Sequence, residues 1–142
     1  MMVVTDSNNF TMQGILMLND ERPILDNEIE LIKALLNFAF PGDDAFTIQV
    51  DRLEKVISWN HDDTILKLCF KSAHSKYQNQ FLRKNLSGSV EASGIDLDGD
   101  AVNVILWITD GEIRDLEFLR PDSKKVQRPP KATDLRDFVK AI

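Results

Sequence analysis

The sequence predicts a single α+β domain over residues 1–142, in which a twisted antiparallel sheet of about five strands carries one long helix on one face, with short peripheral helices around it. Three observations lead to this prediction. Apolar residues recur at helical spacing over residues 26–40. Two apolar runs within residues 101–120 are joined by Asp110-Gly111, a strong signal for a two-residue hairpin turn. A chain of 142 residues has the length of one domain.

This hairpin is expected to be the centre of the sheet. In its simplest register Trp107 lies opposite Arg114, which predicts a cation–π contact between the two side chains. The same register places Asp115 and Glu117 among aliphatic residues on one face. Because both faces are largely apolar, we expect both to be covered. The two carboxylates then either point to water at an incompletely covered face or form an acidic patch for a partner.

The long helix and its successor follow from local signals. Asp26 is the expected N-cap of the helix, and Pro41 begins the Pro-Gly pair that ends it. Asp43 and Asp44 then favour a short second helix, with a strand over residues 46–50 as the alternative.

Shorter patterns assign the other segments: a loosely ordered start over 1–9, a strand or extended arm over 10–18, a turn over 19–23, strands over 53–59 and 64–71, an irregular or helix-like polar stretch over 74–89, and a turn over 94–100. The tail, residues 133–142, carries apolar residues at helical spacing and predicts a short helix. No run approaches the roughly 18 apolar residues of a transmembrane helix, and the first residues do not resemble a signal peptide.

Charge and cysteine content narrow the classes of function. The net charge is −6 and the isoelectric point is about 4.9. Nucleic-acid binding is disfavoured because its usual footprint is a basic patch, whereas an acidic surface suits a basic protein partner. The single cysteine, Cys69, excludes an internal disulfide and fits a reducing cytoplasm. It lies in an apolar run, so we expect a buried small hydrophobic residue rather than a nucleophile.

Residues 96–100, Asp-Leu-Asp-Gly-Asp, begin like a calcium-binding loop. An EF-hand needs glycine at the sixth position and glutamate at the twelfth, and these positions hold Ala101 and Trp107. The segment therefore predicts a turn, with a weak cation site as the alternative. The sequence has no nucleophile elbow, no phosphate-binding glycine loop and no histidines at metal-ligand spacing, so we expect no enzyme, cofactor or metal centre.

The C-terminal half resembles small bacterial immunity proteins. The stretch SGIDLDGDAVNVILWITDGEIRDLEFLRPDSKKVQRPP, residues 93–130, is similar to their Asp-Gly hairpin followed by Leu-Glu and Arg-Pro-Asp, and ERPILDNEIELIKALL, residues 21–36, is similar to their opening helix. Asp122-Ser123 departs from the Asp-Gly usual there. This pattern is a signature of a fold rather than of catalysis.

The resemblance implies an immunity protein of a polymorphic toxin or contact-dependent growth inhibition system, which binds a cognate toxin C-terminal domain in the cytoplasm and covers its active site. Many such toxins are cationic nucleases, so carboxylates are the expected contacts, and neither nucleic acid nor a membrane is an expected partner. The alternative is a regulatory or housekeeping domain that binds a small ligand or a protein. The candidate partner-binding residues are Asp96, Asp98, Asp100, Asp115, Glu117, Asp62 and Asp63, with Trp107 as an aromatic anchor if it is exposed rather than buried.

Overall fold

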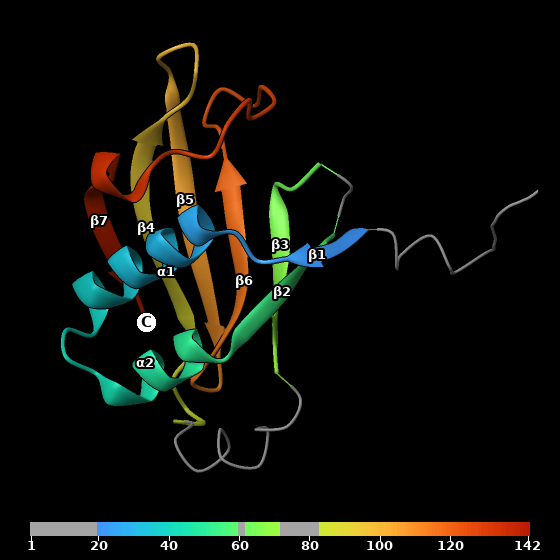
Figure 1. Cartoon of the computed structure of the whole chain (residues 1–142). Coiled ribbons are helices and arrows are strands. Elements are labelled where there is room, and N and C mark those ends of the chain that lie inside the picture. The colour runs from blue at the N-terminus through green and yellow to red at the C-terminus, as the bar shows by residue number, and fades with distance from the viewer. Residues whose placement is uncertain (1–19, 60–61, 72–82) are drawn as a thin grey trace, which may run out of the picture.

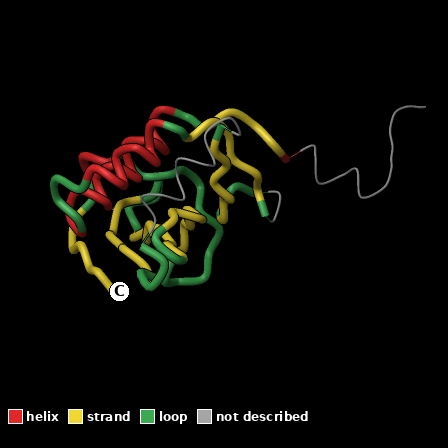
Figure 2. The backbone as a smooth tube through the Cα atoms, turned by 90° about the horizontal axis from the view of Figure 1, so that it is seen from below, coloured by secondary structure: helices red, strands yellow, loops and turns green. Residues whose placement is uncertain are grey.

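We describe a computed structural model of the chain over residues 20–59, 62–71 and 83–142. In this part of the chain seven strands form one twisted antiparallel sheet in the order β1-β2-β3-β6-β5-β4-β7 (Figure 1). Both α-helices lie on one side of it (Figure 2). The predicted α+β class is confirmed, but the sheet is larger than the expected five strands. None of the helices described is long and apolar enough to cross a membrane.

The strands are β1 (Glu21–Pro23), β2 (Leu53–Ser58), β3 (Ile65–Phe70), β4 (Gly88–Ile95), β5 (Ala101–Thr109), β6 (Glu112–Leu119) and β7 (Arg136–Ala141). The helical elements with bounds in the described residues are α1 (Asp26–Ala39), α2 (Asp44–Asp51) and the 3₁₀ turn η3 (Ala132–Asp134). The predicted segments over 1–9 and 10–18, and the polar stretch as far as residue 82, lie outside the described residues.

Helix α1 covers the sheet with a fully buried aliphatic stripe that includes Leu31, Ile32 and Leu35. Its N-cap is Leu25, so the prediction of Asp26 at this position is wrong. Glu28 takes over the capping role, because its Oε1 accepts the Leu25 N–H at 2.9 Å.

Helix α2 begins as the sequence predicts. The Asp43 carboxylate accepts the backbone N–H groups of Ala45 and Phe46 at 3.0 and 3.3 Å, which caps the first turn. The alternative strand over residues 46–50 is not formed.

Buried Gln49 joins α2 to the central hairpin turn. Its Nε2 donates to the Gly111 carbonyl at 2.8 Å, and its Oε1 accepts the Ile113 N–H at 2.9 Å. Asp110 and Gly111 both have positive φ, +50° and +78°, as the predicted type I′ turn requires. A Cβ at Gly111 would lie only 2.4 Å from the backbone nitrogen of Arg83, so this position has no room for a side chain.

A β-bulge at Arg114 changes the register of the hairpin. The two residue pairs nearest the turn form as expected, but beyond them the register shifts and Trp107 lies opposite Asp115. The predicted contact between Trp107 and Arg114 is therefore wrong. Arg114 instead pairs with Glu112, with 2.9 Å between Nε and Oε1.

The bulge keeps polar side chains of the hairpin off the face that points to the helices. The side chains facing the helices are all apolar: Val102, Val104, Leu106, Ile108, Ile113, Leu116 and Phe118. The opposite face, which we call the outer face, carries Trp107, Asp115 and Glu117. The expectation that the two carboxylates share a face with most of the hairpin's aliphatic residues is corrected by this shift.

The tail forms β7 beside β4, not the predicted helix. Pairing satisfies the backbone groups that β4 would otherwise expose at a sheet edge. The ring of Phe138 stacks on Phe38 at 5.1 Å, and Lys140 Nζ donates to the Ala39 carbonyl at 3.1 Å, so the tail is also held against the end of α1.

Two further strands differ from the sequence prediction. Residues 21–23, predicted as part of a turn, form the short edge strand β1 beside β2. The sequence predicts no strand over residues 88–95, yet β4 lies there between β5 and β7. Only Val90 and Ala92 supply buried hydrophobic side chains to β4, so its apolar pattern is short.

Replacing Gln49 by Leu leaves the Gly111 carbonyl and the Ile113 N–H without their buried partner. We expect this substitution to lower the free energy of unfolding by about 2–4 kcal/mol, measured by urea denaturation. Thr47→Ala, at an exposed position of the same helix, is the control and should change stability by less than about 0.5 kcal/mol. Equal midpoints for Gln49→Leu and the unmodified chain would contradict this account of the turn.

Candidate functional site

Arg120 lies at the centre of an aspartate cage. Its side chain is 1% exposed, and Nη1 donates to Asp96 at 3.1 Å and to Asp98 at 2.8 Å. Nη2 donates to Asp100 at 3.2 Å and to Asp122 at 2.6 Å. The predicted turn over residues 96–100 is present, and its aspartates hold the chain's own guanidinium. Within the described ranges no group of three or more His, Cys, Asp or Glu side chains is placed to hold a metal ion.

Asp96 fastens a second segment to this cage. Its carboxylate also accepts the backbone N–H groups of Gln127 and Arg128 at 2.8 and 2.9 Å, and its side chain is fully buried. Asp96 therefore has no surface for a partner, and its assignment as a contact residue is corrected to a structural one. Asp98 and Asp100 are 35% and 62% exposed, but both already share the Arg120 charge.

The cage lowers the pKa of three carboxyl groups, those of Asp96, Asp98 and Asp122. Burial alone would raise the pKa of Asp96, but the N–H donors of Gln127 and Leu97 and the Arg120 guanidinium outweigh it, so the pKa is lowered. The backbone N–H of Asp100, followed by Arg120, lowers the pKa of Asp98. Hydrogen bonding to Arg120 lowers the pKa of Asp122 to about 2.

A second cluster lies on the outer face and contains two exposed indoles. Trp107 on β5 is 41% exposed, and its Nε1 donates to Glu117 at 2.9 Å. Trp59, directly after β2, is 51% exposed, and its Nε1 donates to Asp115 at 3.0 Å. We call these four residues the tryptophan–carboxylate cluster. Its two indoles reach the carboxylates of β6 from opposite sides, Trp107 from β5 and Trp59 from the end of β2, beyond β3.

Neighbouring strands supply the surroundings of the cluster. Ile65 on β3 and Ile105 on β5 are the cross-strand partners of Glu117. Lys67 is the partner of Asp115 on β3, and its Nζ lies 5.9 Å from the centre of the Trp59 ring. The cluster thus has aliphatic flanks and one lysine at its edge.

The described part of the chain supplies no ion-pair partner to either carboxylate. Among the residues that the structure describes, no basic group lies within 4.0 Å of Asp115 or Glu117. One oxygen of each accepts an indole N–H, and in the same part of the chain Asp115 Oδ2 and Glu117 Oε2 accept no hydrogen bond. Neutral donors orient these carboxylates without neutralising them.

The other two predicted residues serve the turn between β2 and β3. Asp62 accepts the backbone N–H and the hydroxyl of Thr64 at 3.2 and 2.8 Å. Asp63 has a positive φ of 59° and pairs with Arg22 at 3.3 Å. Of the predicted site residues, the structure therefore brings together Trp107, Asp115 and Glu117. The other predicted aspartates either surround Arg120 or stabilise the turn between β2 and β3.

Sequence reasoning did not identify Trp59, Lys67 or Arg120. An alternating strand pattern ending at Trp59 is visible in the sequence, but it does not show which face is exposed. Cys69, expected to be buried, is half-buried on the outer face, and burial raises the pKa of its thiol.

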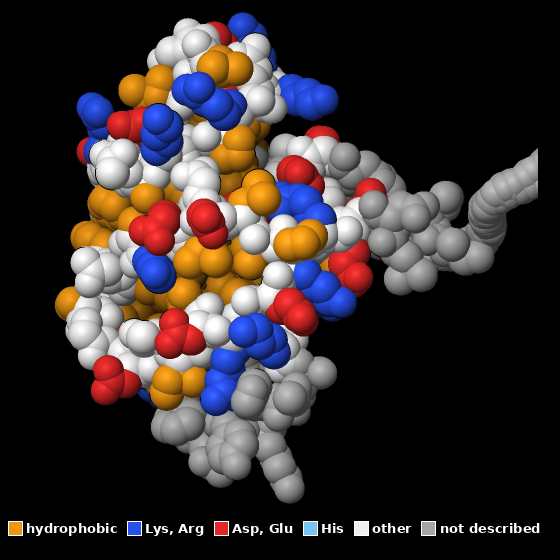
Figure 3. All heavy atoms as spheres, in the orientation of Figure 1, with side chains coloured by type: hydrophobic (Ala, Val, Ile, Leu, Met, Phe, Trp, Pro, Cys, Tyr) orange, Lys and Arg blue, Asp and Glu red, His pale blue; other side chains and the backbone are white. Residues whose placement is uncertain are grey.

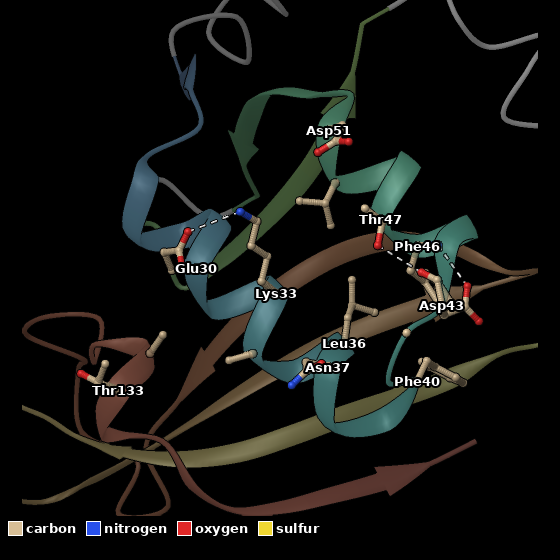
Figure 4. Close-up of a pocket in the computed structure, with 14 residues that line it drawn as sticks. Glu30, Lys33, Leu36, Asn37, Phe40, Asp43, Phe46, Thr47, Asp51 and Thr133 are labelled. Atoms are coloured by element: carbon tan, nitrogen blue, oxygen red, sulfur yellow. Dashed lines mark hydrogen bonds and ion pairs between the residues drawn. The ribbon is translucent and has the colours of Figure 1, made fainter.

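A groove of about 550 Å³ lies between α1, α2 and η3 (Figure 4). Apolar residues within it are Leu36, Phe40, Phe46 and Val50, and polar ones include Glu30, Lys33, Asp43, Thr47 and Asp51. Lys33 points toward Glu30, with 3.6 Å between Nζ and Oε2. On this side of the molecule, acidic and basic side chains are interspersed around hydrophobic surface (Figure 3).

Comparison with protein-family models, curated proteins and solved structures finds no match to this chain. The resemblance to immunity proteins therefore stays a prediction from the sequence.

The aspartate cage predicts a stability that falls in acid. The folded-state pKa values of Asp96, Asp98 and Asp122 lie below the usual value of about 3.9, so their contribution is complete above about pH 5 and is lost as the pH falls toward 2. Asp122→Asn should lower the urea midpoint at pH 7 and flatten its change between pH 5 and 2. Asp51→Asn, at an exposed position of α2, is the control. An unchanged slope for Asp122→Asn would contradict the assignment.

Proposed function

We propose that this chain is an immunity protein, which captures a basic toxin domain in the cytoplasm and covers its active site without catalysis of its own. The observation that carries the proposal is the tryptophan–carboxylate cluster on the outer face. Exposed tryptophans are frequent anchors of protein interfaces, and carboxylates without an internal cation attract the lysines and arginines of a partner. The resemblance of residues 93–130 supports the same role.

The outer face suits a protein better than a small molecule. Trp59 and Trp107 are fixed by hydrogen bonds, so they lose little conformational freedom when a partner binds. Leu119 on the same face is 48% exposed and adds apolar contact area. A face of this composition offers the apolar core that interfaces require, with charge that selects a basic partner.

The groove between the helices favours a second candidate, a regulatory or housekeeping domain that binds a small ligand. Its volume of about 550 Å³ and its apolar floor are typical of ligand sites. Three of its charged lining residues are already paired within the chain, Glu30 with Lys33 and Asp43 with Arg83. The groove therefore offers a ligand less unpaired charge than the outer face offers a partner, and we rank this candidate second.

Replacing both Asp115 and Glu117 by Lys should slow association with a basic toxin domain about tenfold at low salt and weaken the dependence of the rate on salt. The matched control is Glu30→Lys with Asp51→Lys, which changes the net charge equally on the helix side. Stopped-flow kinetics with the cognate toxin domain, to be sought in the reading frames next to this one, measures both association rates. If the two double variants slow association equally, the effect comes from net charge alone, and the outer face is not the interface.

A growth assay tests the biological role. Cells that produce the cognate toxin domain in the cytoplasm should grow when this chain is produced with it, and should stop growing with the Asp115→Lys, Glu117→Lys variant. The helix-side double variant should still rescue growth. Failure of the unmodified chain to bind the toxin domain or to rescue growth would overturn the proposal and favour a ligand search at the groove.

A further inference from the structure

The tryptophan–carboxylate cluster leaves particular groups available to a partner. Both tryptophans of the chain belong to it, and both indole N–H groups are donated to its carboxylates. The available groups are the exposed indole surfaces and one oxygen on each of Asp115 and Glu117. A ligand that fits must therefore combine hydrogen-bond donors, positive charge and a flat surface.

We propose that the cluster is a clamp for a single arginine side chain of the partner. This inference rests on the proposed function and names the chemical group that the outer face recognises. The guanidinium stacks on exposed indole surface and donates to Asp115 Oδ2 and Glu117 Oε2. Its positive charge meets the two carboxylates, which have no internal counter-ion within 4.0 Å in the described part of the chain.

The placement of the carboxylates favours guanidinium over ammonium. Asp115 and Glu117 are two residues apart on β6, so their Cα atoms are about 7 Å apart on the same face. The two available oxygens thus belong to different carboxylates. Guanidinium carries five N–H donors around a rigid plane and can reach both while its face lies against an aromatic ring. Lysine ammonium is a compact point charge that is more strongly hydrated. Removing its water costs more free energy, so its net attraction to the clamp is weaker.

Lys67 provides independent support for a cationic ligand. Its ammonium already lies 5.9 Å from the centre of the Trp59 ring, within the range of a cation–π contact. This distance is at the outer limit of the interaction, and the Lys67 charge repels an incoming arginine. Removing that charge should therefore strengthen arginine binding, which a purely structural role of the cluster would not produce.

The test uses three peptides that differ in one residue: acetyl-Gly-Gly-Arg-Gly-Gly-amide and its lysine and citrulline counterparts. Citrulline keeps the shape of arginine without the charge. The readout is the pair of indole N–H signals in a ¹⁵N-correlated NMR spectrum, because the chain has two tryptophans and both lie in the clamp. The arginine peptide should shift both signals and bind about threefold more tightly than the lysine peptide, and the citrulline peptide should shift neither.

Variants locate the binding. Glu117→Gln keeps one oxygen that accepts the Trp107 N–H, but it removes the charge and replaces the second oxygen by an amide NH2, which cannot accept from a guanidinium. It should weaken binding of the arginine peptide about threefold. Lys67→Met should strengthen it by a similar factor. Glu30→Gln, which removes one charge on the helix side, is the matched control and should leave the affinity unchanged.

Three results would overturn the clamp: indole signals that the arginine peptide does not move, equal affinity for the lysine peptide, or equal weakening by Glu30→Gln and Glu117→Gln. The toxin domain separates this failure from failure of the proposed function. If the toxin domain shifts the indole signals and the arginine peptide does not, the outer face remains the interface and the clamp is wrong. If only the peptide shifts them, the clamp stands and the toxin does not bind at this face.

Discussion

The outer face depends on one extra residue in β6. Ile113, Leu116 and Phe118 all point to the helices, although their spacing of three and then two residues does not fit a regular strand, in which side chains alternate. The bulge at Arg114 absorbs the additional residue. Burial of three apolar side chains therefore also fixes Asp115 and its neighbours on the outer face, and the same constraint that builds the core arranges the candidate site.

At the end of the same hairpin that lies away from its turn, the buried Arg120 side chain requires acceptors and negative charge around it. A buried guanidinium is costly unless its charge and its donors are matched, and four aspartates supply both. The excess negative charge is met partly by backbone donors, since Asp96 also accepts N–H groups from Gln127 and Arg128. The cage thus fastens residues 127–128 to the turn that precedes β5 and has a structural role.

Local signals predicted the local features: α1, the cap at Asp43 and the turn at Asp110-Gly111. The predicted hairpin register is wrong because it assumes no bulge. The spacing of the apolar residues in β6, three residues and then two, does indicate one extra residue. The aspartate cage could also be predicted from the sequence, because an antiparallel hairpin brings residues 96–100 and Arg120 to the same end of the sheet. Long-range contacts could not be predicted from local patterns. Trp59 donates to a carboxylate 56 residues away, and β7 forms by pairing with the edge of β4.

The two acidic clusters show why sequence position does not reveal which carboxylates are available to a partner. Asp96 is matched by a guanidinium and backbone donors inside the fold, so its charge is used within the chain. Glu117 is oriented by an indole N–H, a neutral donor that fixes its position and leaves its charge in place. A carboxylate held in this way is preorganised for a cation that the described chain does not supply. Availability therefore follows from the charge of the group that holds each carboxylate, and this criterion separates Asp115 and Glu117 from the aspartates around Arg120.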